Sequence, residues 1–109
     1  MNAPMTETIA VRTFWWANEP ERQVSVLIGK PILAADGNGK FYCPIRTVGL
    51  GNDEYVQPIF GVDAFQAIEL AMRYVEHRIS DIDAKSGGQL RWQFGHDKRI
   101  PAEWAQQAG

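Results

Sequence analysis

Three side chains in this sequence offer soft or imidazole metal ligands: Cys43, His77 and His96. No two of them stand at a spacing typical of zinc sites, and a structural zinc site takes four ligands. Cys43 alternates with Phe41 and Ile45 along an apolar stretch, so we expect it to be packed inside, where burial raises the pKa of a thiol and blunts its reactivity. The sequence therefore predicts no metal, no cofactor and no catalytic residue.

Two polar groups remain as candidate sites. Asp81 and Asp83 lie near the end of a helical segment, where negative charge is mildly unfavourable, and we interpret them as a solvated helix end rather than a functional pair. The run His96-Asp97-Lys98-Arg99 is either a solvated loop or a site for an anion or a partner's carboxylate. The glycine pairs at 37–39 and 49–51 lack the strand, loop, helix order and the Gly-Lys-Ser/Thr of a phosphate loop.

Tryptophan is the unusual residue type, because four occur in 109 residues. Trp15 and Trp16 are adjacent in an expected strand, so they point to opposite faces of the sheet. One of them lies away from the helix-covered face, where either the C-terminal segment covers it or it belongs to a partner surface. The candidate interaction surface comprises Trp15, Trp16, Trp92, Trp104, His96 and Arg99.

A long helix over residues 62–83 is the element that must organise these groups. Its apolar residues recur at helical spacing, which predicts one inward stripe: Phe65, Ile68, Met72, Val75, Ile79 and Ile82. Asp63 is the expected N-cap, and Gln66, three residues on, completes a capping box.

Four strands are expected before the helix, over residues 8–16, 23–33, 40–48 and 54–60. A turn around Pro20 separates the first two, and Asp36-Gly37-Asn38-Gly39 predicts a hairpin between the next two. Residues 89–94 alternate again and form a fifth strand or cover an edge, with a helical turn over 101–107. The prediction is an α+β fold, a four- to five-stranded antiparallel meander with one long helix packed on one face. Residues 1–7 are expected to be a loose tail, and 84–109 a C-terminal extension.

Composition narrows the class of protein. A length of 109 residues fits a single domain over 1–109, and 45% hydrophobic residues are enough for a core. A net charge of −2 argues against nucleic-acid binding, which needs clustered Lys and Arg. No apolar run approaches a membrane span, no signal peptide is evident, and one cysteine cannot form an internal disulfide, so we expect a cytoplasmic protein.

One stretch carries a resemblance. The run G-V-D-A-F-Q-A-I-E-L-A-M at 61–72, after a strand that contains Phe41, Tyr42 and Cys43, resembles a family of small bacterial domains of unknown function with a G-x-D-x-x-Q-A helix start. The likeness covers residues 8–83. It implies a ββββα arrangement and a bacterial source, and it brings no activity and no functional residues.

These observations favour a small non-catalytic protein that binds a protein partner, in the manner of inhibitors or immunity proteins. The alternative is a small-ligand-binding protein or enzyme with a site near the 96–99 loop. The first strand has no proline between Ile9 and Trp16 to blunt its edge. Both a homodimer through this edge and a monomer are therefore kept as expectations.

Overall fold

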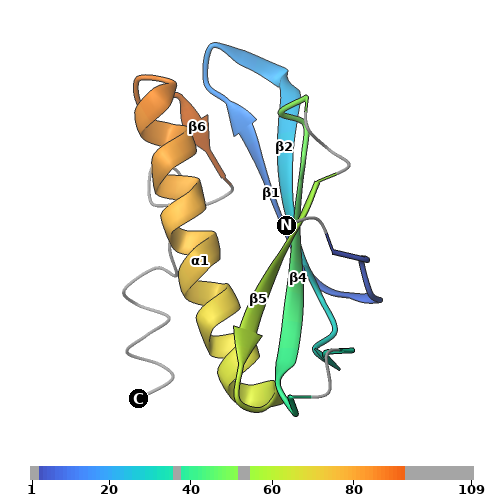
Figure 1. The fold of residues 1–109 in the computed structure, drawn as a ribbon. Coiled ribbons are helices and arrows are strands. Elements are labelled where there is room, and N and C mark those ends of the chain that lie inside the picture. Colours follow the sequence, from blue (N-terminus) through green and yellow to red (C-terminus); the bar gives the residue numbers. More distant parts are fainter. Residues whose placement is uncertain (1–2, 36–37, 52–54, 93–109) are drawn as a thin grey trace, which may run out of the picture.

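The computed structural model describes residues 3–35, 38–51 and 55–92. Within these residues, six strands and one helix follow each other (Figure 1). They are β1 (Thr8–Trp16), β2 (Glu19–Gly29), β3 (Ile32–Leu33), β4 (Phe41–Val48), β5 (Val56–Gly61), α1 (Ala64–Lys85) and β6 (Leu90–Arg91). The predicted α+β class is confirmed, with the helix on one face of the sheet.

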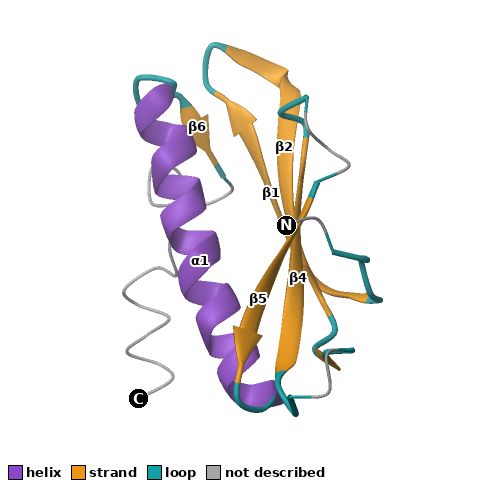
Figure 2. Ribbon diagram, in the orientation of Figure 1, coloured by secondary structure: helices purple, strands orange, loops and turns teal. Residues whose placement is uncertain are grey.

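All strand pairs are antiparallel, and β1, β2, β4 and β5 are successive neighbours as in a meander (Figure 2). The short β3 pairs with β4 beside the end of β2, and β6 pairs with β1 on its outer side. β5 therefore forms one edge of the sheet, while β1 and the two-residue β6 form the other.

The boundaries of β2 correct one expectation. The turn before β2 lies at Ala17 and Asn18, so β2 begins at Glu19, before Pro20 rather than after it. The strand also ends at Gly29, and the chain resumes pairing only after Pro31, as β3. The break follows from the chemistry of proline, which has no N–H to donate to the ladder.

The start of α1 follows the sequence closely. Asp63 is the N-cap, and its Oδ1 accepts the backbone N–H of Gln66 at 2.8 Å. The side chain of Gln66 reaches back one residue further than a capping box requires, because its Oε1 accepts the N–H of Val62 at 2.8 Å. The junction between β5 and α1 is therefore held by two side-chain contacts.

The inward face of α1 is the main correction to the predicted stripe. Ala67 and Ala71 are fully buried with Ile79 and Ile82, whereas Phe65 is 87% exposed and Met72 is 50% exposed. The helix is thus rotated about its axis toward its alanines. Small side chains allow it to approach the sheet closely, and a methyl group on Gly61 would overlap the backbone of Ala67.

The opposite face of the sheet is partly covered by the N-terminal residues that were expected to be a loose tail. Ala3 N donates to Val56 O at 3.0 Å, and the Thr6 hydroxyl donates to Lys30 O at 2.7 Å. Met5 and Thr6 lie where a side chain at Gly29 would otherwise sit. These contacts fix residues 3–7 against the sheet and bury its second face locally.

The connection from α1 to β6 depends on Asp83. Its Oδ1 accepts the backbone N–H of Leu90 at 3.0 Å, and its carbonyl oxygen accepts the Gly88 N–H at 2.8 Å. Gly87 and Gly88 have positive φ values of 74° and 81°, which glycine adopts without strain. Asp83 is therefore a structural residue that returns the chain to the sheet, and not a solvated end.

Gly61→Ala tests the close approach of helix and sheet. The added methyl group has no room beside Ala67, so we expect the free energy of unfolding to fall by about 1–3 kcal/mol. Urea denaturation measures the change. Phe65→Ala is the matched control, since that side chain is 87% exposed and its removal should cost less than about 0.5 kcal/mol. Equal losses in both variants would contradict the assigned inward face.

Candidate functional site

Cys43 and His77, two of the three candidate metal ligands, lie in different environments. Cys43 is fully buried in the core, where its Sγ donates to Gly29 O at 3.2 Å, and burial raises the pKa of the thiol. His77 is exposed on α1. Within residues 3–35, 38–51 and 55–92, no group of three or more His, Cys, Asp or Glu side chains is placed to hold a metal ion.

The three tryptophans within the described residues all contribute to the core, to different extents. Trp16 and Trp92 are buried, with 7% and 4% of their surfaces exposed, and the Trp92 ring lies 6.4 Å from that of Phe14. Trp15 pairs with Arg91 of β6, is partly buried, and packs against the same core, at a point where the pairing of β1 with β2 is irregular. Of the three tryptophans that the structure describes, Trp15 is therefore the one that is only partly buried.

Three of the predicted surface residues, His96, Arg99 and Trp104, lie outside the described residues, as does the rest of the 96–99 loop. A candidate site within the described residues therefore consists of other side chains.

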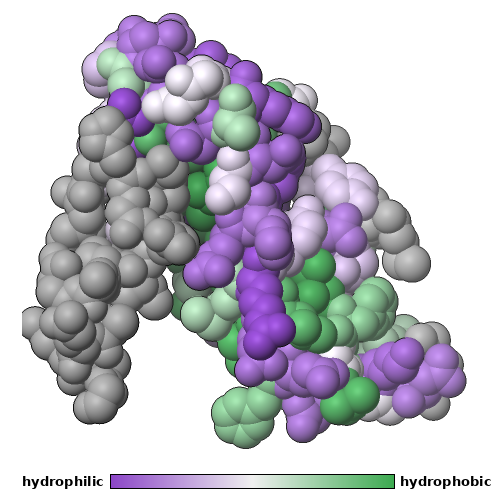
Figure 3. All heavy atoms as spheres, turned by 90° about the vertical axis from the view of Figure 1, so that its left-hand side faces the viewer, coloured by the Kyte–Doolittle hydropathy of each residue, from purple (hydrophilic) through white to green (hydrophobic). Residues whose placement is uncertain are grey.

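The junction of β5 and α1 exposes large apolar side chains. Phe60 is 40% exposed, Val62 67% and Phe65 87%, all within six residues of sequence. Figure 3 shows hydrophobic atoms gathered around this end of the molecule, while the outer surface of α1 is hydrophilic. The ring centre of Phe60 lies 5.9 Å from that of Tyr42, with the two ring planes tilted by 49°, whereas Phe65 lies in the first turn of the helix. We call Phe60, Val62 and Phe65 the junction surface.

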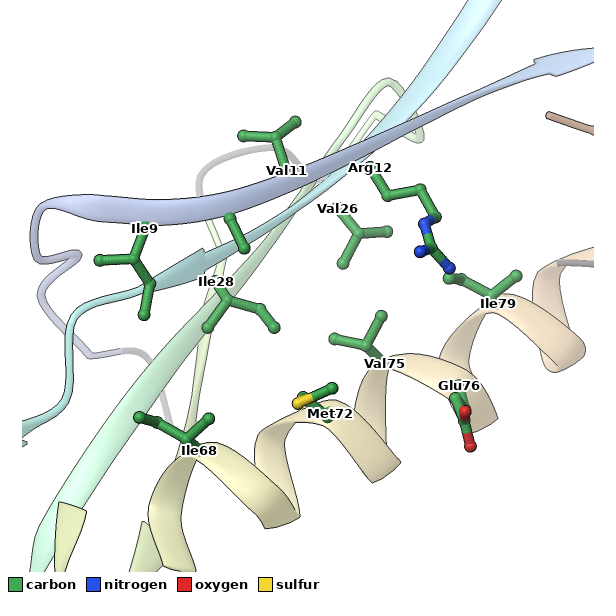
Figure 4. Close-up of a pocket in the computed structure, with 11 residues that line it drawn as sticks. Ile9, Val11, Arg12, Val26, Ile28, Ile68, Met72, Val75, Glu76 and Ile79 are labelled. Atoms are coloured by element: carbon green, nitrogen blue, oxygen red, sulfur yellow. The ribbon is translucent and has the colours of Figure 1, made fainter. Parts of the chain in front are cut away.

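A second apolar surface is a groove of about 230 Å³ between α1 and the strands β1 and β2. α1 lies closest to β4 and β5, and the groove lies on the side of the helix that faces β1 and β2. Ile68, Met72 and Val75 point from the helix toward Val26 and Ile28 on β2 (Figure 4). The groove is therefore floored by the sheet and walled by the helix.

A β-bulge shapes the outer wall of the groove. Thr8 pairs with Gly29 and Ala10 with Ile28, which leaves Ile9 as the extra residue in β1. Ile9 consequently points into the groove, while Val11 points away from it (Figure 4). Both are about half exposed, at 49% and 57%.

Arg12 closes the polar end of the groove. Its guanidinium lies 4.2 Å from the centre of the Trp92 ring, a favourable cation–π geometry. Burial lowers the pKa of this guanidinium, and the nearby carboxylate of Glu76 raises it in part. The groove thus combines an apolar length with one cation at the end where β6 joins β1.

Neither apolar surface was identified from the sequence. Phe65 and Met72 were assigned to the core because their spacing matches a helical stripe, and the signal against this was Ala67 and Ala71, whose small size favours close packing. The bulge at Ile9 has no signature in the residues around it. The groove depends on the direction in which α1 crosses the sheet, which periodicity does not determine.

The chain belongs to the family described as a domain of unknown function, DUF6968, whose profile matches residues 10–102. The predicted membership in a small domain-of-unknown-function family is thereby confirmed. No curated protein and no solved structure matches the chain. Among the residues that the structure describes, no helix has both the length and the apolar character needed to cross a bilayer.

The buried thiol of Cys43 gives a prediction with a definite sign. A raised pKa in the folded state means that its contribution to stability is fully present below the unfolded thiol's pKa of about 8.5 and is lost as pH rises through the folded value. We therefore expect the wild type to lose more stability than Cys43→Ala when the pH is raised above about 8.5.

Urea titrations of both proteins across this pH range measure the difference. Iodoacetamide should label Cys43 in urea and leave it unlabelled in buffer at neutral pH. Rapid labelling of the folded protein, or parallel alkaline curves for the two proteins, would show that the thiol is accessible.

Proposed function

We propose that this protein is a non-catalytic interaction module, of the inhibitor or immunity type, that binds a protein partner through the junction surface. The observation that carries the proposal is Phe65, a large aromatic side chain that is 87% exposed on the first turn of the protein's long helix. Aromatic side chains dominate the binding energy of protein interfaces when they enter a pocket of the partner.

The junction surface is held in place before any partner arrives. Asp63 and Gln66 fix the first turn of α1, and Gly61 lies directly against the helix backbone. An anchor whose backbone is already ordered loses less conformational entropy on binding. This rigidity supports a role for Phe65 as a preorganised anchor.

The charges around Phe65 define the partner's chemistry. Asp63 and Glu69 are both exposed, two residues before and four residues after Phe65. Their carboxylates favour a partner that offers an apolar pocket with Lys or Arg side chains at its rim. Such complementarity accelerates association and makes it sensitive to salt.

We also propose that the protein is cytoplasmic. The single cysteine is a free, buried thiol, which suits a reducing compartment better than an oxidising one where cysteines pair.

Affinity capture from a bacterial lysate with immobilised protein tests the proposal when two variants are run beside the wild type. We expect a partner to be captured by the wild type and by Met72→Ala, which alters the groove, but not by Phe65→Ala. Loss of an anchor of at least about 2 kcal/mol weakens binding roughly 30-fold, which titration of the purified partner would measure. Association should also slow as salt is raised.

A partner that binds Phe65→Ala as tightly as the wild type would overturn the proposal, as would captured proteins that bind all three baits alike. Phe65→Ala must keep the wild-type unfolding curve for the comparison to be made, and its exposure predicts that it does.

A further inference from the structure

A second pocket, of about 120 Å³, lies between α1 and the strands β4 and β5. It shares no lining residue with the groove, and most of the side chains around it are polar. Its lining consists of two residues from each of three segments, namely β4, the start of β5 and α1. They are Ile45 and Thr47, Tyr55 and Gln57, and Tyr74 and Arg78.

The spacing within each pair explains why these six side chains converge. Residues two apart in a strand point to the same face of a sheet, and residues four apart lie on the same side of a helix. Gln57 pairs with Ile45 across β5 and β4, so these two side chains share a face. Ile45 belongs to the core cluster together with Ala67 and Ala71 of α1, so this face is the one that the helix covers.

Polar side chains are unexpected at positions that face the helix, because strand alternation normally places apolar residues there. Gln57 stands opposite Ile45, which is only 2% exposed. The amide of Gln57 is held at both ends, since its Oε1 accepts the Tyr55 hydroxyl at 2.9 Å and its Nε2 donates to Pro58 O at 3.3 Å. An ordered amide and hydroxyl beside an apolar wall are typical of a site that orients a small ligand.

Arg78 gives the pocket a positive charge. It is the sole charged residue among the described residues that line the pocket, and its side chain is 27% exposed. Its Nη1 lies 3.9 Å from Asp81 Oδ2, which is too long for a hydrogen bond, and the same oxygen lies closer to Lys85 Nζ, at 3.0 Å. A guanidinium has five N–H donors, so Arg78 can bind a further carboxylate.

We propose that this pocket binds a small organic carboxylate, with the carboxylate group on Arg78 and the carbon chain against Ile45. The hydroxyls of Thr47 and Tyr74 supply further donors for the carboxylate oxygens. An apolar cavity of about 150 Å³ admits benzene, so the volume of this pocket limits the ligand to about four to six carbon atoms. Inorganic phosphate fits less well, because it has no apolar part to place against Ile45.

An NMR titration of the full chain with linear carboxylates, from acetate to octanoate, tests the proposal. We expect saturable shifts of the backbone amides of Thr47, Gln57, Tyr74 and Arg78, with dissociation constants of about 1–10 mM, as suits ligands of this size. Affinity should rise with chain length up to about four to six carbons and then stop rising, because the pocket is full. Butyramide, the neutral analogue of butyrate, should bind at least about tenfold more weakly.

Variants on α1 separate the pocket from the general charge of the helix. Arg78→Gln should weaken butyrate binding at least about tenfold and leave the weak binding of butyramide unchanged. Arg73→Gln is the matched control, because it removes the same charge from an exposed position of α1 that does not line the pocket, and it should leave butyrate affinity unchanged. Tyr74→Phe should weaken butyrate binding about threefold or more, since it removes only the hydroxyl.

Three results would overturn the proposal. The first is a titration in which no carboxylate of the series gives saturable shifts at these amides below about 50 mM. The second is equal affinity of the wild type for butyrate and butyramide, which would mean that the pocket does not recognise the charge. The third is an equal loss in Arg78→Gln and Arg73→Gln, which would assign the effect to the overall charge of α1. No residue of the junction surface lines this pocket, so these results do not depend on whether Phe65 binds a partner.

Discussion

The close approach of α1 to the sheet at Gly61 is the constraint on which the rest of the structure depends. No side chain larger than hydrogen fits at this point, because the backbone of Ala67 occupies the space. Ala67 and Ala71 are small enough to continue the contact along the helix and are fully buried. Close packing of this kind gains dispersion contacts along the backbone, which compensates for the small apolar area of each alanine.

The two apolar surfaces follow from that contact. A helix that turns its alanines inward exposes Phe65 at the junction surface and leaves Met72 half exposed along the groove. A helix that starts beside β5 and ends beside β6 (Figure 1) borders a groove toward β1 and β2, and Ile9 lines that groove. The packing of α1 against the sheet thus both stabilises the fold and leaves these apolar side chains exposed.

Much of the fold could be predicted from local patterns. Asp63 at the N-cap, the hairpin before β4 and the glycines after Ser86 depend on residues close in sequence, and all three are found. The inward face of α1 could not be predicted, since spacing alone does not distinguish a stripe of large residues from an adjacent stripe of alanines. The groove was beyond prediction for a related reason, because it depends on the crossing direction of α1 and on a bulge at Ile9, both of which are tertiary outcomes.

The contact between Gly61 and α1 can be observed directly by proton NMR. The account predicts strong nuclear Overhauser effects between an α-proton of Gly61 and the amide proton of Ala67, and between the Ala71 methyl group and core side chains such as Cys43 or Ile45. The ring protons of Phe65 should show no such effects to the sheet. Effects from Phe65 to core residues, with the Ala71 methyl group facing solvent, would contradict the central claim.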